Sequence, residues 1–362
     1  MSIVVIFLAA AAAVFAAVLW LLSPGKLRPI LDANGGPLPN SIDEKVHVRI
    51  NGVDQGMIIR SRDASHPVLL FVHGGPGMPG YVLEQKYPTG LEDDFTVVWW
   101  DQRGAGLSYD CVPRETMTRE QFVSDTIAVT DYLRERFGQD RILLLGHSWG
   151  SYIGIQAAVQ HPELYRAYIG MGQISYQLKS EVATYQYMVD AYRDKGDIGM
   201  VRKLQASPCT WTLPMSRKYM ELRDPAMHGL GVGTTHDMRS VLTGIFVPSW
   251  LDREYTVGEK LDIWRGKFAA KSFGLWDEMQ GDDLTERITE LEIPVYFVSG
   301  RYDGTVSCSQ AREYLAQLKA PVKGFYTFAR SAHSPAYEEP EKMRQILRED
   351  VLGGEARLAD RG

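Results

Sequence analysis

The sequence contains little cysteine and no excess of positive charge. Its three cysteines, Cys111, Cys209 and Cys308, are far apart and odd in number, so they provide neither a disulfide framework nor the spacing of a zinc site. We expect buried or half-buried thiols. Lys and Arg number 39 against 45 Asp and Glu, a net charge of −6. Nucleic-acid-binding proteins usually carry a basic stripe, so this balance argues against a nucleic acid partner.

Charge is also absent from the start of the chain. Residues 2–22 carry no charged side chain, and as a helix they would span roughly the ~30 Å hydrocarbon layer of a bilayer. A cleaved signal peptide usually has a basic start and a shorter apolar stretch, whereas the first basic residue here is Lys26. We therefore predict an uncleaved transmembrane anchor over residues 1–23, with a signal peptide as the alternative. Lys26 and Arg28 would place the large domain in the cytoplasm by the positive-inside rule.

Residues 24–44 are rich in Pro and Gly and are interpreted as a linker. Short apolar runs and helical patterns then alternate along the chain. Apolar runs that suit strands buried on both faces occupy residues 67–72, 95–100, 141–145 and 294–299. Residues 45–50 and 56–60 predict an antiparallel hairpin, and residues 119–137, 150–160 and 340–352 have helical spacing. This alternation predicts an α/β fold with a mostly parallel sheet.

The alternation stops near Gly172 and resumes at about residue 293. Between these points the chain is rich in Tyr, Met, Trp and charge, with helical spacing and no clear strand. We predict a mainly helical cap over residues 173–292, inserted between two parts of one core, residues 45–172 and 293–355. Such an insertion would cover the crevice at the carboxyl ends of the strands, where α/β sheets bind ligands.

Residues 146–151, GHSWGS, place Ser148 in a G-x-S-x-G motif between a predicted strand and a predicted helix. This context favours a nucleophile, because a sharp strand-to-helix turn lifts the hydroxyl off the sheet. A serine also needs a base, and the chain order for this turn is Ser, then Asp or Glu, then His. Asp303 follows the predicted strand 294–299, His333 follows another predicted strand, GFYTFA (324–329), and both fit that order. His147 adjoins Ser148 too closely to serve as its base.

The oxyanion of the reaction needs two backbone N–H donors. We predict that Trp149, which follows the nucleophile, supplies one of them. The loop HGGPG, residues 73–77, follows another predicted strand and supplies the second, from Gly75 or alternatively from Gly74.

Four motifs together resemble the proline iminopeptidase (prolyl aminopeptidase) family of α/β-hydrolases. They are HGGPG (73–77), DQRGAGLS (101–108), GHSWGS (146–151) and GRYD (300–303). The resemblance covers residues 45–352 and implies an α/β-hydrolase fold with a helical cap. It also implies a serine peptidase that needs no metal or cofactor and releases N-terminal residues, often proline, from small peptides. It assigns Ser148, Asp303 and His333 as the catalytic triad.

The resemblance further implies acidic cap residues that hold the free ammonium of the substrate. Asp277, Glu278, Glu181 and Glu221 are the candidates, and each also fits a solvated helix face. Within DQRGAGLS, we interpret Asp101 and Arg103 as structural, forming an internal salt bridge behind the oxyanion loop.

We therefore predict an anchored serine hydrolase, an aminopeptidase that acts on short peptides. The alternatives are a carboxylesterase or amidase with the same triad, acting on small acyl substrates, and a non-catalytic membrane-tethered binding protein. Epoxide hydrolase and dehalogenase chemistry would require an aspartate at position 148. An anionic cap pocket would favour the peptidase, and an apolar one the esterase.

Overall fold

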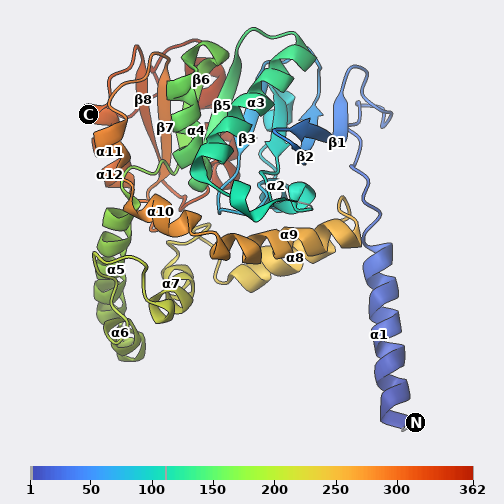
Figure 1. Cartoon of the computed structure of the whole chain (residues 1–362), viewed down its shortest axis with the longest axis vertical. Helices are drawn as coiled ribbons and strands as arrows, with labels where there is room; N and C mark the ends of the chain where they lie inside the picture. Colours follow the sequence, from blue (N-terminus) through green and yellow to red (C-terminus); the bar gives the residue numbers. More distant parts are fainter. Residues whose placement is uncertain (1–2, 111, 362) are drawn as a thin grey trace.

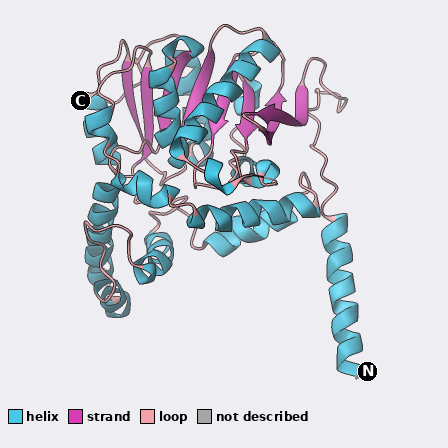
Figure 2. Ribbon diagram, in the orientation of Figure 1, coloured by secondary structure: helices cyan, strands magenta, loops and turns pink. Residues whose placement is uncertain are grey.

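The computed structural model of the protein describes residues 3–110 and 112–361. These residues form an eight-stranded sheet in the order β1-β2-β4-β3-β5-β6-β7-β8, with helices on both faces (Figure 1, Figure 2). The strands are β1 (Ile42–Ile50), β2 (Val53–Ser61), β3 (Val68–Val72), β4 (Thr96–Trp100), β5 (Ile142–His147), β6 (Tyr165–Met171), β7 (Val295–Gly300) and β8 (Lys323–Phe328).

The sheet is antiparallel at one edge and parallel elsewhere. β1 and β2 form a hairpin that turns at Asn51 and Gly52, and β2 pairs antiparallel with β4. Every other neighbouring pair is parallel. This confirms the predicted α/β-hydrolase type of sheet. The all-apolar runs form central strands because both of their faces are covered, so β3 is buried along its whole length.

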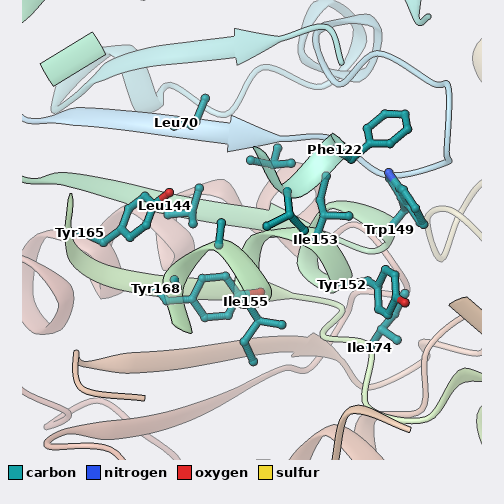
Figure 3. Packing of buried hydrophobic residues seen from close by; sticks show 14 of the residues in the cluster. Leu70, Phe122, Leu144, Trp149, Tyr152, Ile153, Ile155, Tyr165, Tyr168 and Ile174 are labelled. Carbon is teal, nitrogen blue, oxygen red and sulfur yellow. The ribbon is translucent and has the colours of Figure 1, made fainter. Parts of the chain in front are cut away.

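Alternate residues of the strands face two separate hydrophobic cores. One core lies under α3 (Arg119–Phe137), α4 (Trp149–Gln160) and α12 (Cys308–Gln317). Figure 3 shows part of this core, with Trp149, Ile153 and Ile155 of α4 among its side chains. The other core lies under α2 (Tyr81–Lys86), α13 (Pro335–Glu338) and α14 (Pro340–Ile346). The predicted helix 340–352 is α14 followed by a π-helical turn, Leu347–Val351.

Helices also fill the segment between β6 and β7, and most of them lie below the sheet in Figure 1. They are α5 (Gln177–Asp194), α6 (Ile198–Gln205), α7 (Arg217–Leu230), α8 (Val247–Leu251), α9 (Val257–Ala269), α10 (Leu275–Gly281) and α11 (Leu284–Arg287). Part of this cap has a hydrophobic cluster of its own, which includes Met188, Leu204 and Tyr219. α9 instead packs against the loop that follows β4, where a Cβ at Gly266 would lie 2.6 Å from Gly104 O.

At the other end of the chain, α1 (Ile3–Leu21) extends away from the body (Figure 1). Across the part of the chain that the structure describes, no helix combines the length and the apolar character needed to cross a membrane. The predicted transmembrane anchor is therefore not supported, and its first two residues lie outside the described ones.

Residues 22–45, which include the predicted linker, are bonded to the body. The ammonium of Lys260, on α9, donates to Leu22 O (3.1 Å) and Ser23 Oγ (2.8 Å). The buried carboxylate of Glu254 accepts hydrogen bonds from the backbone N–H and the guanidinium of Arg28 (2.8 and 3.0 Å). Lys45 Nζ donates to Gly25 O (3.3 Å) and to Glu254 O (2.7 Å).

Two buried or half-buried free thiols, Cys209 and Cys308, match the prediction, and Cys111 lies outside the described residues.

Candidate active site

Ser148 lies in a sharp turn between β5 and α4. Its backbone has φ 55° and ψ −120°, in the left-handed half of conformational space that side chains other than glycine seldom adopt. The two glycines of the motif allow this turn because other backbone atoms lie too close to them for a side chain to fit. A Cβ at Gly146 would lie 2.5 Å from Gly150 O, and one at Gly150 only 1.9 Å from Val72 O. The turn therefore holds the hydroxyl at the N-terminus of α4, which favours developing negative charge.

Asp303 and His333 form a buried pair behind this turn. His333 Nδ1 lies 2.9 Å from Asp303 Oδ2. The other oxygen, Asp303 Oδ1, accepts the N–H groups of Thr305 (2.9 Å) and Val306 (2.8 Å), which fix the plane of the carboxylate. Asp303 follows β7 and His333 follows β8, so both lie at the carboxyl edge of the parallel strands.

Ser148 lies at the same edge. Its N–H donates to Met171 O, at 2.9 Å, at the end of β6. Among the described residues there is no hydrogen bond between Ser148 Oγ and His333 Nε2. In unliganded enzymes such contacts are often long and tighten only when substrate binds.

Gly172, just beyond β6, forms one wall of the Asp303–His333 pair. Its φ is +55°, and a Cβ there would lie 2.9 Å from His333 Cε1 and 3.4 Å from Asp303 Oδ2. Sequence reasoning used this residue only as a domain boundary. Its role depends on contacts with residues more than a hundred positions away, which no local pattern reveals.

His147 positions the main chain of His333. Its Nε2 lies 2.9 Å from His333 O, and because a carbonyl oxygen accepts, this nitrogen carries the proton. Burial lowers the pKa of His147 to about 3, with His333 as a further cause. The ring therefore stays neutral at physiological pH and acts as a fixed hydrogen-bond donor.

The loop predicted to supply an oxyanion donor passes beside the nucleophile. A Cβ at Gly74 would lie 3.1 Å from Ser148 Cβ. Within the described part of the chain, the backbone N–H groups of Gly74, Gly75 and Trp149 have no acceptor. Unpaired N–H groups at a nucleophilic serine are the donors that a tetrahedral oxyanion requires.

Glu181, one of the predicted ammonium-binding acids, is buried and fully hydrogen-bonded. Its carboxylate accepts both Nε (2.7 Å) and Nη2 of Arg223. It also accepts the hydroxyl of Tyr219 (3.1 Å) and the amide of Gln177 (3.1 Å). Arg223 thus neutralises its charge, so Glu181 as placed here has no free oxygen lone pair for a substrate ammonium.

The other three cap acids lie on exposed surfaces. Glu278 pairs with Arg119 at 3.4 Å, and Glu221 with Arg217 at 2.8 Å. Asp277 is exposed at the start of α10. None of these contacts includes a residue of the predicted triad.

Residues 67–340 match the protein-family model described as the alpha/beta hydrolase fold. The chain belongs to the α/β-hydrolase family. The match spans the candidate nucleophile, acid and base, and it agrees with the mostly parallel sheet.

Known relatives of this α/β-hydrolase include aminopeptidases. The chain is 32% identical over 315 residues to "Probable aminopeptidase YbaC" of Bacillus subtilis, which covers 86% of this chain and 97% of that protein. It is 23% identical to the proline iminopeptidase of Heyndrickxia coagulans, over 78% of this chain and 88% of that one. These relatives confirm the predicted family resemblance.

A proline iminopeptidase of Mycobacterium smegmatis has a similar solved structure. The TM-score is 0.57 at 18% sequence identity, and the match covers 86% of this chain and 100% of that one. This likeness supports the fold.

The DQRG motif of this hydrolase pairs differently from the prediction. Arg103 Nε and Nη2 bind Asp125 on α3, at 2.7 and 2.9 Å, and not Asp101. Asp101 instead accepts the N–H of Leu107 (2.8 Å), and burial raises the pKa of its carboxyl to about 7. The predicted internal salt bridge is present, but its acid comes from a helix outside the motif.

Glu338, which sequence reasoning missed, holds the loop that carries His333. Its two oxygens accept the N–H groups of Ala332 (2.9 Å) and His236 (2.5 Å). His333 N also donates to Gly233 O at 3.3 Å. Because Gly233 and His236 belong to the cap, the cap is bonded directly to the loop of the candidate base.

Proposed function

We propose that this α/β-hydrolase is a serine hydrolase that works through an acyl-enzyme. The observation that carries the proposal is the 2.9 Å contact of His333 Nδ1 with Asp303 Oδ2, at the sheet edge where Ser148 is held in a strained turn. Asp303 holds the imidazole so that Nε2 is the basic nitrogen, and it stabilises the imidazolium that forms.

In the first half-reaction, Ser148 Oγ bonds to the substrate carbonyl carbon while His333 Nε2 takes the hydroxyl proton. The oxyanion accepts the N–H groups of Trp149 and Gly75, which have no other acceptor in the described residues. When the tetrahedral adduct collapses, the bond to the leaving group breaks and the leaving group takes the proton from His333. In the second half, water gives its proton to His333 and bonds to the acyl carbon, and Ser148 leaves with that proton.

We further propose that the substrates are short peptides with a free N-terminus, of the proline type. The support is the similarity to proteins named as aminopeptidases and proline iminopeptidases over most of the chain. A cap that lies over the carboxyl edge would exclude long chains.

A carboxylesterase or amidase with the same triad is the second candidate. The neutralisation of Glu181 by Arg223 favours it, because the only buried acid among the four predicted ones is already occupied. Recognition of a substrate ammonium would then need another acid or a rearrangement of the cap.

The nucleophile is tested by Ser148→Ala, with Ser309→Ala as the control because Ser309 is exposed on α12. We expect S148A to lose turnover and labelling by a fluorophosphonate while its unfolding curve keeps the wild-type shape. S309A should behave as wild type. Comparable turnover in S148A would refute the mechanism, and a wild type without turnover or labelling would favour a non-catalytic binding protein.

The substrate class is tested with proline- and alanine-aminomethylcoumarin, each with a free or an acetylated amine, beside a p-nitrophenyl ester. Hydrolysis of the free-amine amides alone supports the aminopeptidase. Hydrolysis of the ester alone, or equal rates for free and acetylated amines, would support the esterase or amidase and leave the triad in place.

A further inference from the structure

Gln102 lies behind the proposed oxyanion hole and contacts both of its sides. Its side-chain amide donates from Nε2 to His73 O at 2.7 Å, and its Oε1 accepts the indole N–H of Trp149 at 2.9 Å. Gln102 is 1% exposed, so water does not compete for these bonds. One side chain thus connects the loop after β3 to the residue that follows the nucleophile.

The backbone of Gln102 sets the tautomer of His73. The N–H of Gln102 points at His73 Nε2 at 3.1 Å, and because a backbone N–H can only donate, this nitrogen is the acceptor. Nδ1 therefore carries the proton and donates it to Gly74 O at 2.7 Å. Burial lowers the pKa of His73 to about 4, which keeps the ring neutral and this tautomer in place at neutral pH.

The bond to Gly74 O also orients the next N–H. The carbonyl of Gly74 and the N–H of Gly75 belong to one planar trans peptide, so they point in opposite directions. Fixing the carbonyl toward His73 turns the N–H of Gly75 away from that ring. Gln102 therefore acts on Gly75 through His73 and on Trp149 through its indole.

We propose that Gln102 is a positioning residue that holds the two oxyanion donors, Gly75 N–H and Trp149 N–H, at a fixed separation. It touches no reacting atom. The inference rests on the proposed function, because it requires that a tetrahedral oxyanion forms at Ser148. Catalysis by such donors depends on their being organised before the charge develops. A loosened pair should therefore weaken binding of the transition state more than binding of the substrate.

The test is Gln102→Met, which keeps the length of the side chain and removes both amide hydrogen bonds. The matched control is Gln156→Met. Gln156 is also buried, and both of its amide atoms are bonded, to Tyr152 O (2.8 Å) and to Arg287 (2.9 Å). It lies on α4 two turns beyond the nucleophile, so it reports the general cost of removing a buried amide.

Three quantities are measured: kcat and KM for p-nitrophenyl acetate, and the inhibition constant of phenylboronic acid. The boronic acid accepts Ser148 Oγ at boron, the hydroxyl proton passes to His333, and the resulting anion resembles the tetrahedral adduct. We expect Q102M to lower kcat and weaken boronic acid inhibition by the same factor, roughly tenfold to a hundredfold, less than the typical loss of a donor itself. KM should change less than twofold. Q156M should leave all three values near those of wild type.

If Q102M and Q156M lose kcat and boronic acid inhibition equally, or if only KM changes in Q102M, the inference is overturned and the proposed function stays intact. A wild type that neither turns over substrate nor binds the boronic acid would overturn both. If Q102M does not fold, Trp149→Phe tests the same connection from the other end, because it removes the indole N–H and keeps the backbone donor. A wild-type inhibition constant in W149F would then refute the proposal.

Discussion

Replacing Gly172 by alanine should slow the enzyme through a single methyl group. The new Cβ would lie 2.9 Å from His333 Cε1 and 3.1 Å from Nδ1, whereas ordinary van der Waals contacts begin at 3.4 Å. The imidazole would therefore have to move by about 0.5 Å, the difference between 3.4 and 2.9 Å. A ring held by one hydrogen bond to Asp303 cannot make this movement without tilting away from the carboxylate.

The size of the effect follows from two separate terms. Misplacement of a catalytic group by about 1 Å can cost on the order of 10² in rate, so a movement of about half that distance should lower kcat by roughly tenfold. The positive φ of residue 172 adds a backbone penalty of roughly 1–2 kcal/mol for any L residue with a Cβ. That second term reduces stability and leaves the chemistry unaffected.

Gly138→Ala separates the two terms. Gly138 ends α3 with φ +62°, and a Cβ there would meet no atom within 4 Å. Both variants should lose stability in urea unfolding through the backbone term, but only G172A, whose Cβ also meets the His333 ring, should lose kcat for the p-nitrophenyl ester. A G172A variant with kcat within twofold of wild type would refute the reasoning, as would an equal loss of kcat in G138A.

Two further predictions concern buried charges. Arg223→Met should lower the free energy of unfolding by about 3–5 kcal/mol, because it leaves the buried Glu181 carboxylate without its counter-charge. Arg217→Met, which breaks an exposed pair, should cost less than about 1 kcal/mol in the same urea titration, and similar losses in both variants would contradict the argument. Burial raises the pKa of Glu84 to about 8, above its ordinary value of 4.5. The stability from its protonated form is then complete below about pH 4.5 and is lost as the pH rises through about 8. Glu84→Gln should therefore gain stability relative to wild type between pH 5 and pH 8, and a constant difference across that range would disprove the assignment.

Elements with strong local signals could be predicted from the sequence. The helix predicted over residues 119–137 is α3 (Arg119–Phe137), because Thr118 caps its start and Gly138 ends it in a left-handed conformation. β6 was not predicted as a strand, although six of its seven residues are buried. Its sequence, YRAYIGM, contains an exposed arginine that interrupts the apolar run.

The candidate site likewise contains residues that the sequence predicts and contacts that it does not. Ser148, Asp303 and His333 each follow a strand, so the topology of a parallel sheet is enough to bring them to one edge. The sequence could not show which cap acid binds a substrate ammonium, because the role of each acid depends on whether a basic residue already pairs with it. Arg223, which neutralises Glu181, lies 42 residues along the chain on another helix. Motif membership likewise did not reveal that Arg103 bonds Asp125.

The bonds of residues 22–45 to the body determine where this chain can be shortened. A shortened protein that begins at Lys45 would lack Arg28, which bonds the buried Glu254. It would also lack the acceptors of Lys260, a residue on a helix packed against the DQRG loop. A truncation within α1 that keeps Leu22 and Ser23 would preserve both attachments. The natural cut for a shortened protein therefore lies before Leu22, inside the helix and not at the start of the hydrolase core.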